Sequence, residues 1–314
     1  MERVVLGLAG ARGYVGQELL RILARHPRFA LSFVASRTHA GKRVAEHLQG
    51  APPDLVFEEL GPEAIAARRA DAVVLALPND AAAPYVAALE PRTVIVDVSA
   101  DHRFDDAWVY GLPELNRARI RGATRIANPG CYATAAALVV APVAPLLDGP
   151  AEAFGVSGYS GAGATPSPRN DVEALRDNLM PYALVGHVHE REVTRHAGPV
   201  CLMPHVAPFF RGIAMTVALR LREPLEAAAL RALYEGAYEG EPLVRITTEA
   251  PLVRAAMNLP YATIGGFAVD PERRRAVVVA TLDNLLKGAA SQAVQNLNLA
   301  FGFPELTGIE PWPS

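Results

Sequence analysis

Cysteine, net charge and long apolar runs are all scarce in this 314-residue sequence. Its two cysteines, Cys131 and Cys201, are too few for the disulfide framework of a small secreted protein, which favours free thiols in a reducing compartment. The formal net charge of −3 supplies no basic field for nucleic acid or an anionic membrane. No apolar run is long enough to span a bilayer, and the N-terminus enters a strand pattern without a cleavable leader. These absences predict a cytoplasmic protein that binds neither nucleic acid nor membrane.

What is present in the first third is an alternation of strand-like and helix-like segments. Residues 14–25 have apolar side chains at helical spacing. The short apolar runs predict buried strands at residues 4–8, 31–35, 71–77 and 93–98. Strands that alternate with helices indicate right-handed crossovers and a mostly parallel sheet of the dinucleotide-binding type.

The second half has longer strand-like stretches with fewer helices between them. They lie at residues 200–221, 243–246 and 276–282. This pattern predicts an α+β domain with a largely antiparallel sheet. Residues 289–301 have helical spacing and return to the first domain in this interpretation. The expected division is a cofactor domain of residues 1–130 plus 288–314 and a catalytic and dimerisation domain of residues 131–287.

A glycine-rich loop joins the first strand to the first helix. Gly7, Gly10, Gly13 and Gly16 let a phosphate approach the backbone, and the helix N-terminus offers unpaired N–H groups and a positive dipole end. The spacing is a variant of the usual fingerprint, and a glycine-rich turn without a ligand is the alternative. The candidate cofactor-binding residues here are Gly10, Arg12, Gly13, Tyr14, Val15 and Gly16.

The end of the second strand favours NADP over NAD. Ser36 and Arg37 stand where an acidic residue would select the ribose 2′-hydroxyl of NAD, and an arginine suits a 2′-phosphate. Arg12, from the glycine loop, is placed to assist. The alternative is that Arg37 belongs to a solvated basic face with Lys42 and Arg43.

Cys131 is the candidate nucleophile. It follows the turn Asn128-Pro129-Gly130 and precedes an apolar helical stretch, so its sulfur is expected at a helix N-terminus, where the pKa of a thiol falls. A small buried residue that caps a helix is the alternative. Cys201, within the strand-like VCLM, is interpreted as a core residue.

A cysteine nucleophile needs an acid/base partner, and the segment GHVHERE offers His187 and His189. The two histidines also have a spacing compatible with metal ligands, but no neighbouring residue completes an obvious site, and we expect no metal. A polar surface loop is the remaining interpretation, and His205 is a third candidate base.

These segments together resemble the N-acetyl-γ-glutamyl-phosphate reductases, relatives of aspartate-semialdehyde dehydrogenase. The resemblance spans nearly the whole chain and rests on GLAGARGYVG, ASRTHAGK, DVSADHRF, YGLPEL, IANPGCYATA, SGYSGAG, HVHEREV, MPHVAPFFRGI and DNLLKGAASQAVQNLN. It implies a Rossmann domain, a second α+β domain with the dimer interface, and NADPH-dependent reduction of an acyl phosphate to an aldehyde through a cysteine thioester.

The resemblance also implies roles for individual residues. Cys131 matches the nucleophile and His189 the general acid/base, with His187 as the reserve candidate. The expected substrate-binding residues are Arg103, Asn128, His187, Glu192 and Arg211. The further cofactor contacts are expected from Pro78, Ser160, Gly161 and Asn284. A homo-oligomer, either a dimer or a tetramer, is implied as well.

Several positions depart from the family pattern. Ala133 replaces a proline, Arg12 a small residue and Asn79 a histidine, and Glu190-Arg191 stands for the usual Thr-Pro. The same chemistry on a related acyl phosphate is the alternative: an aspartyl phosphate, an aminoadipyl phosphate or a glutamyl phosphate on a carrier protein. A non-catalytic NADP sensor and a metal-dependent hydrolase that uses the two histidines are alternatives of other classes.

Overall fold

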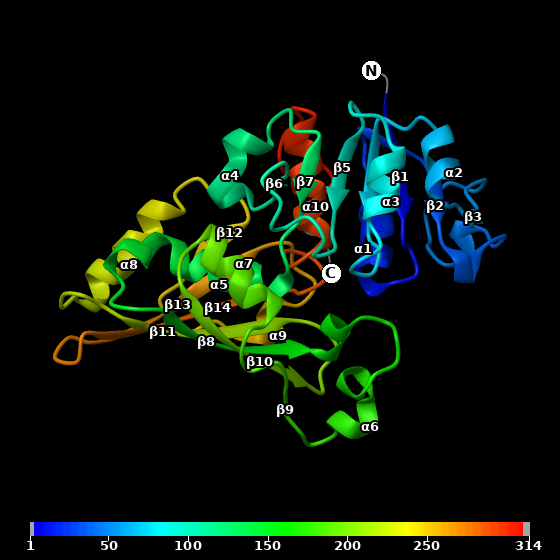
Figure 1. Cartoon of the computed structure of the whole chain (residues 1–314). Helices are drawn as coiled ribbons and strands as arrows, with labels where there is room; N and C mark the ends of the chain where they lie inside the picture. The colour runs from blue at the N-terminus through cyan, green and yellow to red at the C-terminus, as the bar shows by residue number, and fades with distance from the viewer. Residues whose placement is uncertain (1–2, 310–314) are drawn as a thin grey trace. The chain divides into compact units, whose positions relative to one another are not determined.

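The computed structural model describes residues 3–309, which form two compact units (Figure 1). The first unit contains the chain up to Pro129 and again from Ala289, and the second contains Gly130–Gly288. Within the described residues, no helix has the length and apolar character needed to cross a membrane.

The first unit is built on a seven-stranded parallel sheet with the strand order β3-β2-β1-β4-β5-β7-β6. The order reverses between β1 and β4, and a crevice at the carboxyl ends of the strands beside such a reversal is where ligands bind in this architecture. The strands are β1 (Val4–Ala9), β2 (Phe29–Ala35), β3 (Phe57–Glu58), β4 (Ala72–Leu75), β5 (Val94–Asp97), β6 (Val109–Tyr110) and β7 (Arg125–Ala127).

Helices cover this sheet because its central strands are apolar on both faces. All four residues of β4, AVVL, are buried. Helix α1 (Tyr14–Leu23) packs against α10 (Ala290–Ala300), which also contacts β5 and α4 (Pro113–Ile120). Helices α2 (Pro62–Ala67) and α3 (Ala83–Ala88) pack against each other. The predicted parallel sheet is confirmed, and α10 belongs to the first unit.

The second unit holds a seven-stranded mixed sheet with the order β12-β13-β14-β11-β8-β10-β9. Only the pairs β12–β13 and β8–β10 are parallel, so the prediction of a largely antiparallel sheet is also confirmed. The strands are β8 (Ala151–Gly158), β9 (Met180–Pro181), β10 (Val200–Ala207), β11 (Ile213–Arg220), β12 (Val244–Ile246), β13 (Ala262–Asp270) and β14 (Arg275–Leu282).

Helix α5 (Cys131–Val140) is the central helix of the second unit. Nine of its ten residues are buried, and it packs on β8, β11 and β14 and against α7 (Val188–His196). At its C-terminal end, the Tyr234 and Tyr238 hydroxyls donate to the carbonyls of Val139 and Leu138, so the last turn is satisfied by side chains from α8 (Ala227–Ala237) and the residue that follows it. The remaining α-helices are α6 (Val172–Leu175) and α9 (Val253–Ala256).

Two expectations for this half need correction. The strand-like stretch 200–221 is two strands, β10 and β11, which flank β8 on opposite sides. Cys201 is exposed rather than part of the core, because side chains alternate along β10 and its neighbours Val200 and Leu202 point inward. The apolar letters around Cys201 do not reveal which face of the strand it occupies.

Candidate active site

The glycine loop has the geometry of a phosphate cradle. Gly10 has a φ of +89°, and a Cβ there would lie 2.1 Å from the Ala76 carbonyl oxygen, so only glycine fits. Helix α1 begins at Tyr14, directly after Gly13, and no side chain caps its first turn. A Cβ on Gly13 would meet nothing within 4 Å, which leaves the N–H groups of this turn open to an approaching anion.

A cavity of about 350 Å³ lies beside this loop. Its wall contains five of the predicted cofactor residues: Gly10, Arg12, Ser36, Arg37 and Pro78. The Ser36 hydroxyl is buried there without a hydrogen-bond partner among the described residues, which is costly unless a ligand supplies one. The cavity therefore fits the adenosine end of a dinucleotide.

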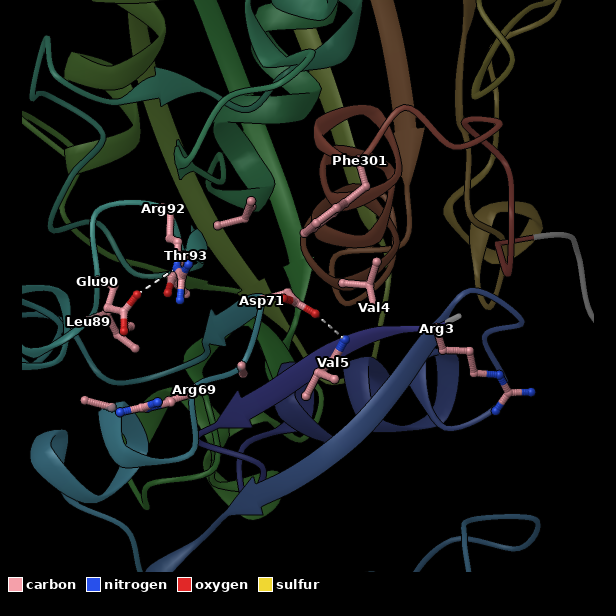
Figure 2. A pocket seen from close by; sticks show the side chains of 13 residues that line it. Arg3, Val4, Val5, Arg69, Asp71, Leu89, Glu90, Arg92, Thr93 and Phe301 are labelled. Atoms are coloured by element: carbon pink, nitrogen blue, oxygen red, sulfur yellow. Dashed lines mark hydrogen bonds and ion pairs between the residues drawn. The ribbon is translucent and has the colours of Figure 1, made fainter. Parts of the chain in front are cut away.

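A second cavity, of about 620 Å³, opens at the other end of the same strands, where β1 begins (Figure 2). Several of its charged side chains have hydrogen-bond or ion-pair partners among the lining residues. The Asp71 carboxylate accepts the Val5 N–H at 2.9 Å, and Glu90 pairs with Arg92 at 2.7 Å. Arg3 and Arg69 lie on opposite sides of the view, so no convergent set of groups forms (Figure 2).

Cys131 is the first residue of α5, as its sequence context predicts. Gly130 precedes the helix without a side-chain cap, so the N–H groups of the first turn have no partner within the helix. The turn itself is fixed from two sides. The Glu192 carboxylate, fully buried, accepts the Gly130 N–H at 2.9 Å, and the Thr134 hydroxyl donates to the Gly130 carbonyl at 3.1 Å. The Cys131 thiol thus sits at a helix N-terminus whose turn is held in place.

Gly288 forms the support beneath the cysteine. A Cβ on Gly288 would lie 2.8 Å from the Cys131 Cβ and 2.7 Å from the Asn284 carbonyl oxygen. The segment that carries Gly288 and Asn284 is anchored by Asp283, whose carboxylate accepts the N–H groups of Leu285 and Asn258. The fit between this segment and Cys131 leaves no room for an added methyl group.

The two candidate histidines lie at the start of α7, which packs against α5. Nδ1 of His187 accepts the His189 N–H at 3.1 Å, so His187 acts as the cap of the helix. Burial lowers the pKa of His187, with the Arg169 charge as a further cause, which keeps the ring neutral in this role. The His189 ring lies 4.8 Å from the His187 ring and 6.1 Å from the Tyr132 ring, measured between centroids.

The other predicted site residues of the second unit are Ser160, Gly161, Arg211 and Asn284. Asn284 donates to the Ser160 hydroxyl at 2.9 Å and accepts the Gly212 N–H at 2.6 Å, and Gly161 lies against this pair. Nε of Arg211 pairs with the buried Asp283 carboxylate at 2.6 Å. The guanidinium of Arg211 is therefore already held by a carboxylate of the protein.

In the first unit, Arg103 and Asn128 belong to one buried network. Arg103 donates to the carbonyls of Asn128 and Val98, both at 2.9 Å. The Asn128 side chain contacts the Ala289 carbonyl and Asn296, so helix α10 holds the turn that leads to Cys131. These contacts position the turn; the expected contacts of both residues with substrate remain predictions.

Two tyrosines near Cys131, Tyr132 and Tyr182, were not among the site residues predicted from the sequence. Tyr132 is buried and donates its hydroxyl to the His205 main-chain carbonyl at 2.6 Å, and Nδ1 of His205 lies 3.1 Å from the Met203 carbonyl oxygen. Burial, with the nearby Cys131 charge as a second cause, raises the pKa of Tyr182, which keeps its hydroxyl protonated. Adjacency to the cysteine was a signal for Tyr132, whereas Tyr182 lies some fifty positions away and had none.

Two family models match the chain. The semialdehyde dehydrogenase NAD-binding domain matches residues 5–123, and the semialdehyde dehydrogenase dimerisation domain matches residues 131–284. The sequence is 55% identical to N-acetyl-gamma-glutamyl-phosphate reductase of Xanthomonas campestris pv. campestris (strain B100), over 98% of this chain and 99% of that one. It is 56% identical to the protein of the same name of Stenotrophomonas maltophilia (strain R551-3), over 97% of each chain.

Solved structures with a similar fold are more distant in sequence. Aspartate semialdehyde dehydrogenase II from Vibrio cholerae has a TM-score of 0.77 at 19% identity, over 96% of this chain and 99% of that one. The enzyme from Candida albicans, solved with NADP, has a TM-score of 0.73 at 16% identity, over 95% and 98% of the two chains.

Proposed function

This chain belongs to the N-acetyl-γ-glutamyl-phosphate reductases of the semialdehyde dehydrogenase family, and on that premise we propose that it reduces N-acetyl-γ-glutamyl phosphate with NADPH. The products are N-acetyl-glutamate γ-semialdehyde and phosphate. The observation that carries the proposal is Cys131 at the open N-terminus of α5, in a chain that matches these reductases over nearly its full length. We also propose a cytoplasmic homo-oligomer, a dimer or a tetramer, assembled through the second unit, which matches the dimerisation domain.

The proposed mechanism uses Cys131 and His189 in sequence. His189 accepts the thiol proton, and the Cys131 thiolate attacks the acyl carbon and expels phosphate to leave a thioester. The N–H groups of the first turn of α5 stabilise the negative oxygen in this step. Bound NADPH supplies the hydride that reduces the thioester. The C–S bond of the resulting thiohemiacetal then breaks to release the aldehyde, and His189 returns the proton to the thiolate.

The capping geometry supports His189 over His187 as the acid/base. Nδ1 of His187 is occupied by the His189 N–H, and a protonated His187 would lose this cap. His189 matches the general acid/base of the family and lies on α7, the helix that packs against α5. His189 is therefore the better proton carrier.

Selectivity for NADPH is assigned to Ser36, Arg37 and Arg12, which share the wall of one cavity. We expect Arg37→Asp to weaken NADPH binding by about 10–100-fold, the effect of one charged hydrogen bond to a phosphate, and to leave NADH binding unchanged or tighter. Titration of protein fluorescence with each cofactor measures both constants. Arg69→Asp, at the opposite end of the sheet, is the matched control for the change in charge. Equal weakening of both cofactors by Arg37→Asp would contradict the assignment.

The reverse reaction tests the function as a whole. N-acetyl-glutamate γ-semialdehyde and NADP are supplied with and without phosphate, and the rise of NADPH absorbance is followed. We expect a signal that requires phosphate, because only phosphate releases the acyl group as an acyl phosphate. Reduction of NADP without phosphate would exclude the acyl-phosphate scheme. Turnover only with aspartate or aminoadipate semialdehyde would replace the substrate.

A further inference from the structure

The loop between β8 and β9 holds Arg169 in a defined position. Asn170 accepts the Ser167 N–H at 2.7 Å and donates to the carbonyls of Gly163 and Thr165 at 2.8 and 2.7 Å. These three bonds close the short helical turn Pro168–Asn170, on which Arg169 lies. A long side chain on a fixed backbone loses less freedom when it binds a ligand.

The Arg169 guanidinium lies over the face of Tyr182, with Cζ 4.9 Å from the ring centroid. The Tyr182 ring in turn meets the His187 ring edge-on, with 5.5 Å between centroids. We call Arg169, Tyr182 and His187 the Arg169 cluster. The Arg169 charge acts on both partners. It adds to burial in lowering the pKa of His187, and it offsets part of the rise in the pKa of Tyr182 that burial and the Cys131 charge cause. The cluster therefore adjoins Cys131 and the acid/base helix.

Arg169 differs from the arginines that the sequence singled out. Arg211 pairs with a buried carboxylate, and Arg103 donates to two main-chain carbonyls. Arg169 is exposed, and within residues 3–309 it makes no ion pair. A guanidinium stacked on an aromatic ring keeps its N–H edge available for two parallel hydrogen bonds to a carboxylate.

We propose that the Arg169 cluster binds the α-carboxylate of the acylated amino-acid substrate, an inference that rests on the proposed function. The substrate carries two anionic groups, and the phosphoryl group leaves from the acyl carbon when the thioester forms. The α-carboxylate remains through every step and lies a short carbon chain away from the sulfur. The α-carboxylate therefore needs a cation that lies close to Cys131 but not in contact with its sulfur. Arg169 supplies that cation, and the protonated Tyr182 hydroxyl adds a donor next to it.

The test removes the cation and the carboxylate in turn. Arg169→Gln is compared with the wild-type enzyme in the reverse reaction, with N-acetyl-glutamate γ-semialdehyde and with 4-acetamidobutanal, which lacks the α-carboxylate. We expect Arg169→Gln to raise KM for the first aldehyde about 10–100-fold, with kcat changed less than about threefold and KM for phosphate and NADP unchanged. For 4-acetamidobutanal the variant and the wild type should be alike. Arg169→Lys should restore part of the affinity.

Arg176→Gln is the matched control, because Arg176 is an exposed arginine nearby in the chain that pairs with Glu173. Loss of activity by Arg169→Gln on both aldehydes alike would overturn the proposal and indicate a structural role. A raised KM for phosphate would assign Arg169 to the phosphoryl group instead, and unchanged kinetics would exclude it from the site. A wild-type enzyme without phosphate-dependent turnover would overturn the proposed function itself, and this result precedes any variant.

Discussion

Cys131→Ser should lower the rate of the phosphate-dependent reaction by roughly 10³–10⁵-fold while NADPH binding stays intact. A serine hydroxyl stays protonated near neutral pH, whereas a thiol at a helix N-terminus forms the nucleophilic anion more readily. The alkoxide is also a poor leaving group, so an ester formed on serine would not release the aldehyde after reduction. Initial rates of NADPH formation and a fluorescence titration with NADPH measure the two quantities.

Cys201→Ser is the matched control for this substitution. Cys201 is exposed on β10, so the same atom exchange should change the rate less than about twofold. Alkylation by iodoacetamide should inactivate the wild type and the Cys201 variant at similar rates. A Cys131→Ser enzyme that keeps more than a tenth of the wild-type rate would refute the thioester mechanism.

Gly288→Ala should impair both stability and catalysis. The added methyl group would meet the Cys131 Cβ at 2.8 Å and the Asn284 backbone at 2.7 and 2.8 Å, and neither neighbour is a flexible chain end. The φ of Gly288 is not positive, so lack of space and not backbone strain is the cause. We expect a cost of about 1–3 kcal/mol in the free energy of unfolding and, because Cys131 is displaced, a loss in kcat of about 10–100-fold.

Thermal unfolding and steady-state kinetics of the same preparation test this expectation. Gly236→Ala is the control, because Gly236 lies in α8 with nothing within 4 Å of its Cβ position. Alanine there should raise the free energy of unfolding by about 0.5–1 kcal/mol and leave kcat unchanged. A Gly288→Ala enzyme with wild-type kcat would show that the Cys131 position tolerates this displacement.

Local sequence patterns were sufficient for much of the fold. Strands β1, β2, β4 and β5 lie where short apolar runs predict them, and α1 begins directly after the glycine loop. Cys131 begins α5 because Asn-Pro-Gly is a turn and the residues after it favour a buried helix. Each of these features depends on residues within a few positions of one another, and such interactions are visible in a linear sequence.

The order of strands in the second sheet had no local signal. Strand β8 lies between β10 and β11, although both follow it in the chain. Its sequence, AEAFGVSG, contains glycine and serine and does not predict a central strand. Helix α7 carries too few apolar residues to be predicted from periodicity, with only Glu192 and Val193 buried among its nine. Packing against α5 decides that this polar segment is helical.

The sequence by itself determined the kinds of residue that the chemistry needs: a glycine loop for a dinucleotide, a cysteine at a helix start, and two histidines as candidate acid/base groups. It did not show where the histidines lie relative to the cysteine. Only the tertiary structure decided what holds that cysteine. Glu192 reaches the Gly130 N–H from 62 positions away, and Gly288 closes on Cys131 from the other end of the unit. Arg169 meets Tyr182 through a turn with no periodicity of its own. Such contacts depend on how sheets and helices pack in three dimensions. The spacing of residues along the chain does not reveal which distant residues come into contact.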